Sequence, residues 1–303
     1  MNINKIQLKQ KIDEMVNEVI EKLKAKLGTY LESITLSGSY AIGKMSLERP
    51  NINILLFAKT SPPANLYLET GIILYNIGKK YLKYFRFRVD PFPFRFARSI
   101  GEKELEVSVN LNIFEMTDKD LAIWITPTKK IRTPFGAPEP VIQSLKSMRK
   151  VVFGKDVLDS MEFHVTYEGI LLNVIREFPT YRLQLTRAPL TYDIDKEYEF
   201  LATEAIQIGK TCLGSAVGVL LDEKSIEQGK HLELLEDKKK LLEFIKKSGS
   251  PDLIKWAEII ISSRDNFLEM KKDKRKAFKL YNAAYNILNM FFGIALSKVF
   301  GDK

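Results

Sequence analysis

Apolar positions in the first half of the chain switch between helical and strand spacing. Residues 5–27 and 65–84 place apolar side chains three and four positions apart, which predicts two amphipathic helices. Residues 33–38 and 51–58 are short apolar runs bounded by glycine, serine or proline, which is typical of strands. Residues 104–114 alternate cleanly between polar and apolar positions and predict a further strand.

Three other segments complete the first half. Residues 84–90 and 94–100 alternate phenylalanine with arginine and are separated by prolines, a pattern that indicates a half-buried hairpin. Residues 117–125 begin with a capping Thr/Asp pair and predict a short helix. Residues 141–154 have helical spacing that ends at Gly154, and they predict another helix.

The pattern changes near residues 153–160, after which helical spacing dominates. We therefore predict two domains, 1–157 and 158–303, with the fold class α+β: a mixed sheet with helices, then an all-helical C-terminal domain. The predicted helices of the second domain cover residues 161–177, 193–221, 225–247, 251–270 and 272–300.

Asparagines occupy one side of two predicted strands. Because side chains alternate along a strand, Asn51 and Asn53 share one face and the isoleucines beside them share the other. Asn110 and Asn112 stand in the same relation to their apolar neighbours. Asparagine is depleted in strands, so this placement predicts a polar cleft floor. An ordinary solvent-facing sheet edge is the alternative.

The segments "LSGSYAIG", "PNINILLF" and "VSVNLNIF" resemble the nucleotidyltransferase superfamily, which includes polymerase β, poly(A) polymerases, CCA-adding enzymes and kanamycin nucleotidyltransferase. The resemblance covers roughly residues 30–158 and implies a nucleotidyltransferase-like sheet. It implies that Gly38 and Ser39 contact a nucleotide phosphate. In the family, an Asp-x-Asp pair and a third carboxylate hold two metal ions, and here those positions carry asparagines.

Those asparagines change the expected chemistry. Mg²⁺ is bound by carboxylates and substrate phosphates, whereas an asparagine amide is neutral and can donate a hydrogen bond. We therefore expect no metal cofactor and a catalytically degenerate protein that binds nucleotide or nucleic acid, or serves as a non-catalytic subunit. One alternative is an active Mg²⁺-dependent transferase that uses the displaced acids Glu48, Glu104 or Glu106. Another is a scaffold that binds a protein partner.

Net charge is +9, and all of the surplus lies in the first half. Residues 1–150 contain 24 Lys and Arg against 15 Asp and Glu, whereas residues 151–303 contain 23 of each. A basic half favours a polyanionic partner, although the charge can also serve solubility alone.

A basic aromatic segment, residues 79–98, is the predicted nucleic-acid surface. Because side chains alternate along a strand, its phenylalanines are predicted to lie in the core. Arg86, Arg88 and Arg95 then form a basic face that meets phosphate. A second basic run, residues 271–279, is either a solvated helix start or a contact with a phosphate backbone. The aromatic residues around and after that run are expected in the core of a helical bundle: Phe278, Tyr281, Tyr285, Phe291 and Phe292.

Several classes of protein are not expected. His164 and His231 lie far apart in the sequence, so neither a zinc site nor a histidine-based triad is predicted. Cys212 is the only cysteine and the N-terminal segment is charged, which indicates a reducing cytoplasm and no signal segment. Residues 280–300 contain asparagines and a lysine, and they predict an amphipathic helix rather than a membrane span.

Overall fold

The computed structural model describes residues 4–59, 64–91, 103, 105–115, 122–125, 130–133, 139–159, 165–190 and 198–301. The chain forms two compact units. The first comprises Met1–Trp124, Arg132–Ala137 and Val141–Glu162, and the second comprises Ile125–Ile131, Pro138–Pro140 and Phe163–Lys303. Whether an independently folding domain ends at residue 157 stays a prediction.

A five-stranded mixed sheet forms the centre of the first unit, in the order β3-β4-β2-β1-β7. Strand β1 is antiparallel to both of its neighbours, whereas β4 is parallel to β2 and to β3. The strands are β1 (Leu31–Ser37), β2 (Asn51–Ala58), β3 (Arg86–Pro91), β4 (Glu106–Glu115) and β7 (Arg149–Gly154).

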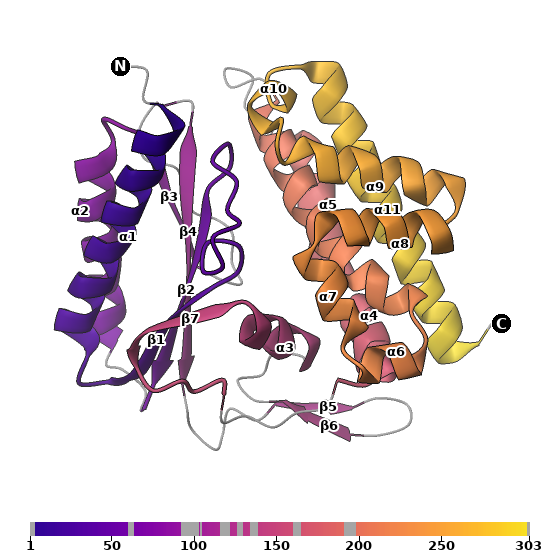
Figure 1. Cartoon of the computed structure of the whole chain (residues 1–303), viewed down its shortest axis with the longest axis horizontal. Helices are drawn as coiled ribbons and strands as arrows, with labels where there is room; N and C mark the ends of the chain where they lie inside the picture. The colour runs from indigo at the N-terminus through magenta and orange to yellow at the C-terminus, as the bar shows by residue number, and fades with distance from the viewer. Residues whose placement is uncertain are drawn as a thin grey trace. The chain divides into compact units, whose positions relative to one another are not determined.

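Two helices cover the apolar face of this sheet, α1 (Lys5–Leu27) and α2 (Ala64–Tyr81), and they lie side by side (Figure 1). The Asn4 side chain caps α1 and forms a capping box with Gln7. The core between helices and sheet contains Ile12, Leu56 and other fully buried side chains. Helix α2 approaches the sheet so closely that a Cβ on Gly78 would lie 2.3 Å from Phe87 Cδ1.

Helices make up all of the described elements from residue 167 onward, as the sequence predicts. Together with the mixed sheet, this confirms the α+β fold class followed by a largely helical C-terminal region. Pro179 and Pro189 lie within the first of these helices. The elements are α4 (Tyr167–Leu190), α5 (Glu199–Leu220), α6 (Glu223–Glu227), α7 (Lys230–Glu236), α8 (Lys238–Ser248), α9 (Pro251–Ser263), α10 (Phe267–Met270) and α11 (Lys274–Phe300).

Helix α11 packs against α4, α5 and α9 and buries Leu280, Ile287 and Phe291, among others. By length and composition it is the one described helix that could cross a membrane. A core helix of a globular protein passes the same test, so this observation is weak.

Two predicted helices are partly wrong. Residues 122–125 form strand β5 (Ala122–Ile125), which pairs with β6 (Lys130–Thr133). The segment 141–154 divides into α3 (Glu139–Ser147) and strand β7. Strand β7 hydrogen-bonds to β1, so a distant partner decides its conformation against the local helical spacing.

Candidate functional site

Three asparagine side chains meet on the polar face of the sheet. Asn110 Nδ2 donates to Asn51 Oδ1 at 2.9 Å and to Asn53 Oδ1 at 2.7 Å. The parallel pairing of β2 and β4 places Asn53 and Asn110 in register, which explains why side chains 57 residues apart meet. The predicted convergence is confirmed for this amide cluster of Asn51, Asn53 and Asn110.

The Gly38–Ser39 turn lies beside the amide cluster. Gly38 has a φ of 76°, and a Cβ there would lie 2.8 Å from Asn53 Nδ2. The N–H of Gly38 donates to the Met148 carbonyl at 2.8 Å, so it is already used within the protein. A phosphate at this turn would therefore be held by Ser39 and the groups around it. The turn continues with Lys44 N–H donating to the Ser39 carbonyl at 2.7 Å.

Asn112 occupies β4 two positions beyond Asn110, where its backbone is in register with Leu55. Whether Asn112 joins the amide cluster stays a prediction. Of the two asparagines on β4, Asn110 is the one whose hydrogen bonds join it to the amide cluster.

The amide cluster does not provide a ready cation site. Two of its three amide oxygens, Asn51 Oδ1 and Asn53 Oδ1, already accept hydrogen bonds from Asn110. Across the described part of the chain, no three His, Cys, Asp or Glu side chains gather in a way that could hold a metal ion. Neutral amides alone bind Mg²⁺ weakly because this hard cation is normally held by carboxylates and phosphates.

The predicted basic face is wrong for Arg86 and Arg88. These residues are only 6% and 7% exposed. Glu106 faces both, with its Oε2 at 3.0 Å from Arg86 Nε and its Oε1 at 3.8 Å from Arg88 Nη1. Parity placed these side chains correctly on one face of the sheet, but that face is covered and not solvated. The pairing also uses Glu106, one of the displaced acids considered for metal binding.

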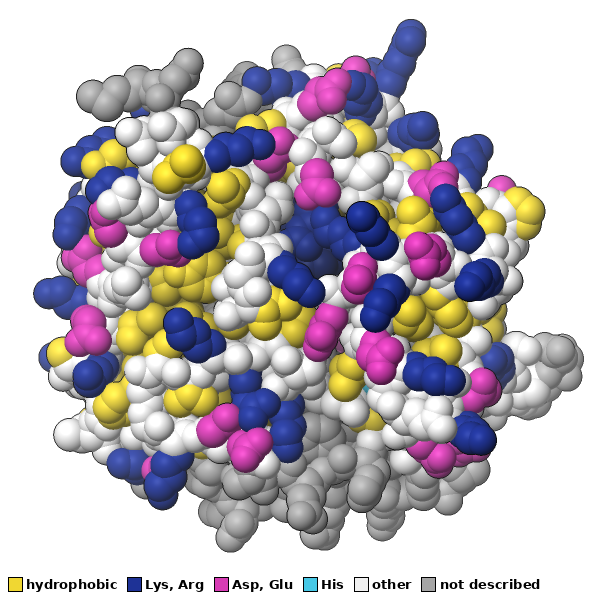
Figure 2. All heavy atoms as spheres, viewed as in Figure 1, with side chains coloured by type: hydrophobic (Ala, Val, Ile, Leu, Met, Phe, Trp, Pro, Cys, Tyr) yellow, Lys and Arg dark blue, Asp and Glu magenta, His cyan; other side chains and the backbone are white. Residues whose placement is uncertain are grey.

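Two further sequence predictions concern the same segment. Phe85 and Phe87 are fully buried, which confirms their assignment to the core. Arg95 lies outside the described residues. On the face drawn in Figure 2, lysine and arginine side chains are scattered, with acidic side chains between many of them. The role of Arg86, Arg88 and Arg95 in binding nucleic acid stays a prediction, and burial of the first two argues against it.

Asp90 is an acid that the sequence pattern alone does not single out. On β3 its backbone is in register with Asn110, just as Arg86 is in register with Glu106. Asp90, Asn110 and Asn53 therefore occupy neighbouring positions across three adjacent strands. The sequence does place Asp90 on the same strand face as Arg86 and Arg88. Its position next to Asn110 follows only from the pairing of β3 with β4.

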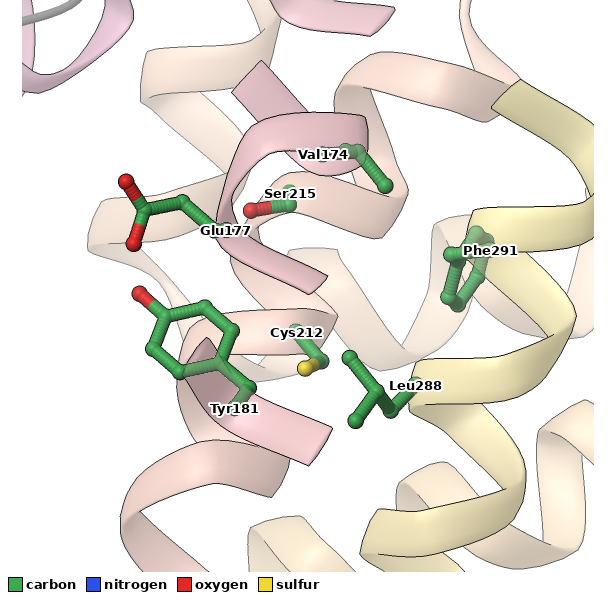
Figure 3. A pocket seen from close by; sticks show the side chains of 7 residues that line it. All are labelled: Val174, Glu177, Tyr181, Cys212, Ser215, Leu288 and Phe291. Atoms are coloured by element: carbon green, nitrogen blue, oxygen red, sulfur yellow. The ribbon is translucent and has the colours of Figure 1, made fainter. Parts of the chain in front are cut away.

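A separate small pocket lies within the helical unit, between α4, α5 and α11 (Figure 3). The Glu177 carboxylate and the Tyr181 hydroxyl point away from Phe291, so the pocket has a polar rim and an apolar floor. Burial raises the pKa of the Cys212 thiol to about 12, which makes it a poor nucleophile near neutral pH. The lining residues are Val174, Glu177, Tyr181, Cys212, Ser215, Leu288 and Phe291.

No protein-family model and no curated protein sequence matches this chain. Among solved structures, the chain is similar to spectinomycin adenyltransferase AAD(9) from Enterococcus faecialis, whose crystal structure contains ATP and spectinomycin. The two chains are 11% identical, the match covers 90% of this chain and 98% of the other, and the TM-score is 0.48. A likeness of this size establishes neither family nor activity, so the interpretation below depends on the residues of the site.

Proposed function

We propose that the first unit binds a nucleotide through the Gly38–Ser39 turn and the amide cluster, without metal-dependent nucleotidyl transfer. The hydrogen bonds from Asn110 Nδ2 to Asn51 Oδ1 and Asn53 Oδ1 carry this proposal. In the superfamily that the sequence resembles, carboxylates at these positions hold the metal ions. Here the same positions form a neutral amide network in which Asn110 Nδ2 donates to both other side chains.

The charge of the site favours an anion. Three carboxylates would repel a phosphate unless metal ions neutralised them, whereas three amides produce no such repulsion. Within the described residues, Asn51 Nδ2 donates to no protein group, so its N–H bonds remain available to a phosphate oxygen. Asn51 is partly exposed, which leaves this donor within reach of a ligand.

Calorimetric titration with ATP tests the proposal, once with EDTA and once with MgCl₂. We expect binding in EDTA that does not require Mg²⁺, and we expect Asn51→Ala to weaken it. Asn17→Ala is the matched control because Asn17 is an exposed asparagine on α1, away from the cluster. Binding that requires Mg²⁺, or equal effects of the two variants, would contradict the proposal.

An active transferase remains the second candidate, and one observation favours it. The register of β3 and β4 places Asp90 beside Asn110, so one acid occupies a strand next to the cluster. Incubation of ATP with MgCl₂ and a panel of hydroxyl acceptors tests this candidate. Release of pyrophosphate that is abolished by EDTA and by Asp90→Asn would establish it and would remove the non-catalytic proposal. A purely protein-binding scaffold would show neither ATP binding nor turnover.

A further inference from the structure

Helix α11 has an unusual composition and an ordered outer face. Its 27 residues contain five Lys or Arg and no Asp or Glu. Lys274, Phe278, Tyr281, Tyr285 and Phe292 recur at spacings of three, four and seven, so they share one side of the helix. We call these five residues the α11 stripe.

Aromatic contacts connect the α11 stripe from one turn to the next. The ring centroids of Phe278 and Tyr281 lie 6.5 Å apart, and those of Tyr281 and Tyr285 lie 6.1 Å apart. At the far end, Phe292 stacks on Phe178 of α4 with a centroid distance of 3.7 Å. At the helical rise of 1.5 Å per residue, the stripe is about 27 Å long, enough for several nucleotides.

The sequence predicts that these aromatic residues lie in the core of the helical bundle, and the structure agrees only in part. Phe291 is 1% exposed and does belong to the core, but Phe278 is 38% exposed. Tyr281, Tyr285 and Phe292 are partly exposed. Aromatic side chains that are open along one face of a helix can accept a further ring against them.

Cations and amides accompany the stripe. Lys274, Arg275 and Lys279 are exposed at its N-terminal end, and within the described residues they form no ion pair. The guanidinium of Arg182 lies 4.4 Å from the centroid of Tyr285 and donates to the Asn289 side chain. A fixed cation therefore lies midway along the stripe, and a cluster of cations lies at its end.

We propose that the α11 stripe binds single-stranded nucleic acid. Proteins that hold single strands combine aromatic rings, on which bases stack, with cations that track the phosphate backbone. The stripe provides open rings at Phe278 and Tyr281, while Lys274, Arg275 and Lys279 provide the cations. Helix α11 itself contributes no acid, and the two acids at its basic end are engaged, Asp273 as the N-cap and Glu269 in an ion pair with Lys276. This site lies in the second unit and does not rest on the function proposed for the first.

Fluorescence anisotropy with labelled oligo(dT), measured across a salt series, tests the electrostatic part. The triple variant Lys274→Gln/Arg275→Gln/Lys279→Gln should flatten the log–log salt slope by about two units, since each phosphate contact on a single strand contributes about 0.7. The matched control, Lys239→Gln/Lys240→Gln/Lys247→Gln, removes the same charge from exposed positions on α8 and should leave the slope unchanged. Equal effects of the two triple variants would overturn the proposal.

Stacking is tested separately with Phe278→Leu, which keeps an apolar side chain and removes the ring. We expect about tenfold weaker binding, within the range reported for loss of one stacked base. Phe300→Leu is the control because Phe300 is 54% exposed at the far end of α11. Ultraviolet crosslinking to oligo(dT) should label peptides that contain Phe278, Tyr281 or Tyr285. Crosslinks confined to the first unit, or no oligo(dT) binding at low salt, would refute the site, as would binding to anionic vesicles in place of oligo(dT).

Discussion

Gly38 and Asn53 are packed so closely that a Cβ on Gly38 would lie 2.8 Å from Asn53 Nδ2 and would force that amide to shift. Gly38 also has a positive φ of 76°, a backbone conformation that residues other than glycine adopt only at a cost in free energy. The turn therefore affects the amide cluster directly, because a side chain at position 38 would shift the Asn53 amide, whose oxygen accepts from Asn110.

We predict that Gly38→Ala lowers the free energy of unfolding by about 1–2 kcal/mol, from the backbone strain alone. It should also abolish ATP binding, because Asn53 must move. Urea denaturation and calorimetric titration measure the two effects. Gly229→Ala isolates the strain, since Gly229 has a φ of 73° and no atom within 4 Å of its added Cβ. If both variants bind ATP like the parent, the turn has no part in the site.

Glu106 is the counter-charge for two buried arginines, and its loss should be severe. Glu106→Gln removes the carboxylate that faces the buried Arg86 and Arg88, and we expect the free energy of unfolding to fall by about 3–5 kcal/mol. Glu258→Gln is the control because it breaks an exposed pair with Lys246, and its effect should stay within about 0.5 kcal/mol. The free energies of unfolding are measured by guanidinium denaturation. If Glu106→Gln lowers this free energy as little as Glu258→Gln does, the buried pair contributes little to stability.

Cys212 should be unreactive in the folded protein. Burial raises the pKa of its thiol from 9.0 to about 12, so almost no thiolate exists near pH 8. A disulfide reagent such as DTNB should react slowly with the native protein and rapidly in urea. Because the folded pKa is the higher one, the contribution of this thiol to stability is fully present below about pH 9. It is lost as the pH rises toward 12, and Cys212→Ala should lack that loss. Rapid native labelling would show that the thiol is accessible.

The sequence pattern predicted which side chains share a face but not what covers that face. Alternation predicted that Asn51 and Asn53 share one strand face, because alternation is a local property of each strand, and the pairing of β2 with β4 then brings Asn110 to them. Alternation also placed Arg86 and Arg88 on one strand face, but it could not predict that this face is buried, since burial depends on residues distant in sequence.

The sequence pattern also did not predict which strands pair with one another. The segment 149–154 has helical spacing, yet β1 recruits it into the sheet. A Cβ on Gly154 would lie 1.9 Å from the Glu32 carbonyl oxygen, so glycine is needed at this position for a reason that only the paired structure reveals. Asp90 became a candidate in the same way, through the register of β3 with β4.

Carboxylates placed at the three cluster positions should create a cation site. In the variant Asn51→Asp/Asn53→Asp/Asn110→Asp, three carboxylates would replace side chains whose polar atoms now lie 2.7–2.9 Å apart. Like charges at this distance repel, so the variant should melt at a lower temperature than the parent in EDTA. A divalent cation neutralises that repulsion, and MnCl₂ should raise the melting temperature of the variant but not that of the parent.

The matched control places the same three charges where they do not converge. Asn17→Asp/Asn65→Asp/Asn76→Asp changes exposed positions on α1 and α2, and its melting temperature should not respond to MnCl₂. Electron paramagnetic resonance of free Mn²⁺ gives a second measurement, because bound Mn²⁺ loses its sharp solution signal. Equal Mn²⁺ binding by the parent and the cluster variant would mean that the amides already hold a metal, and the non-catalytic proposal would then fail with it.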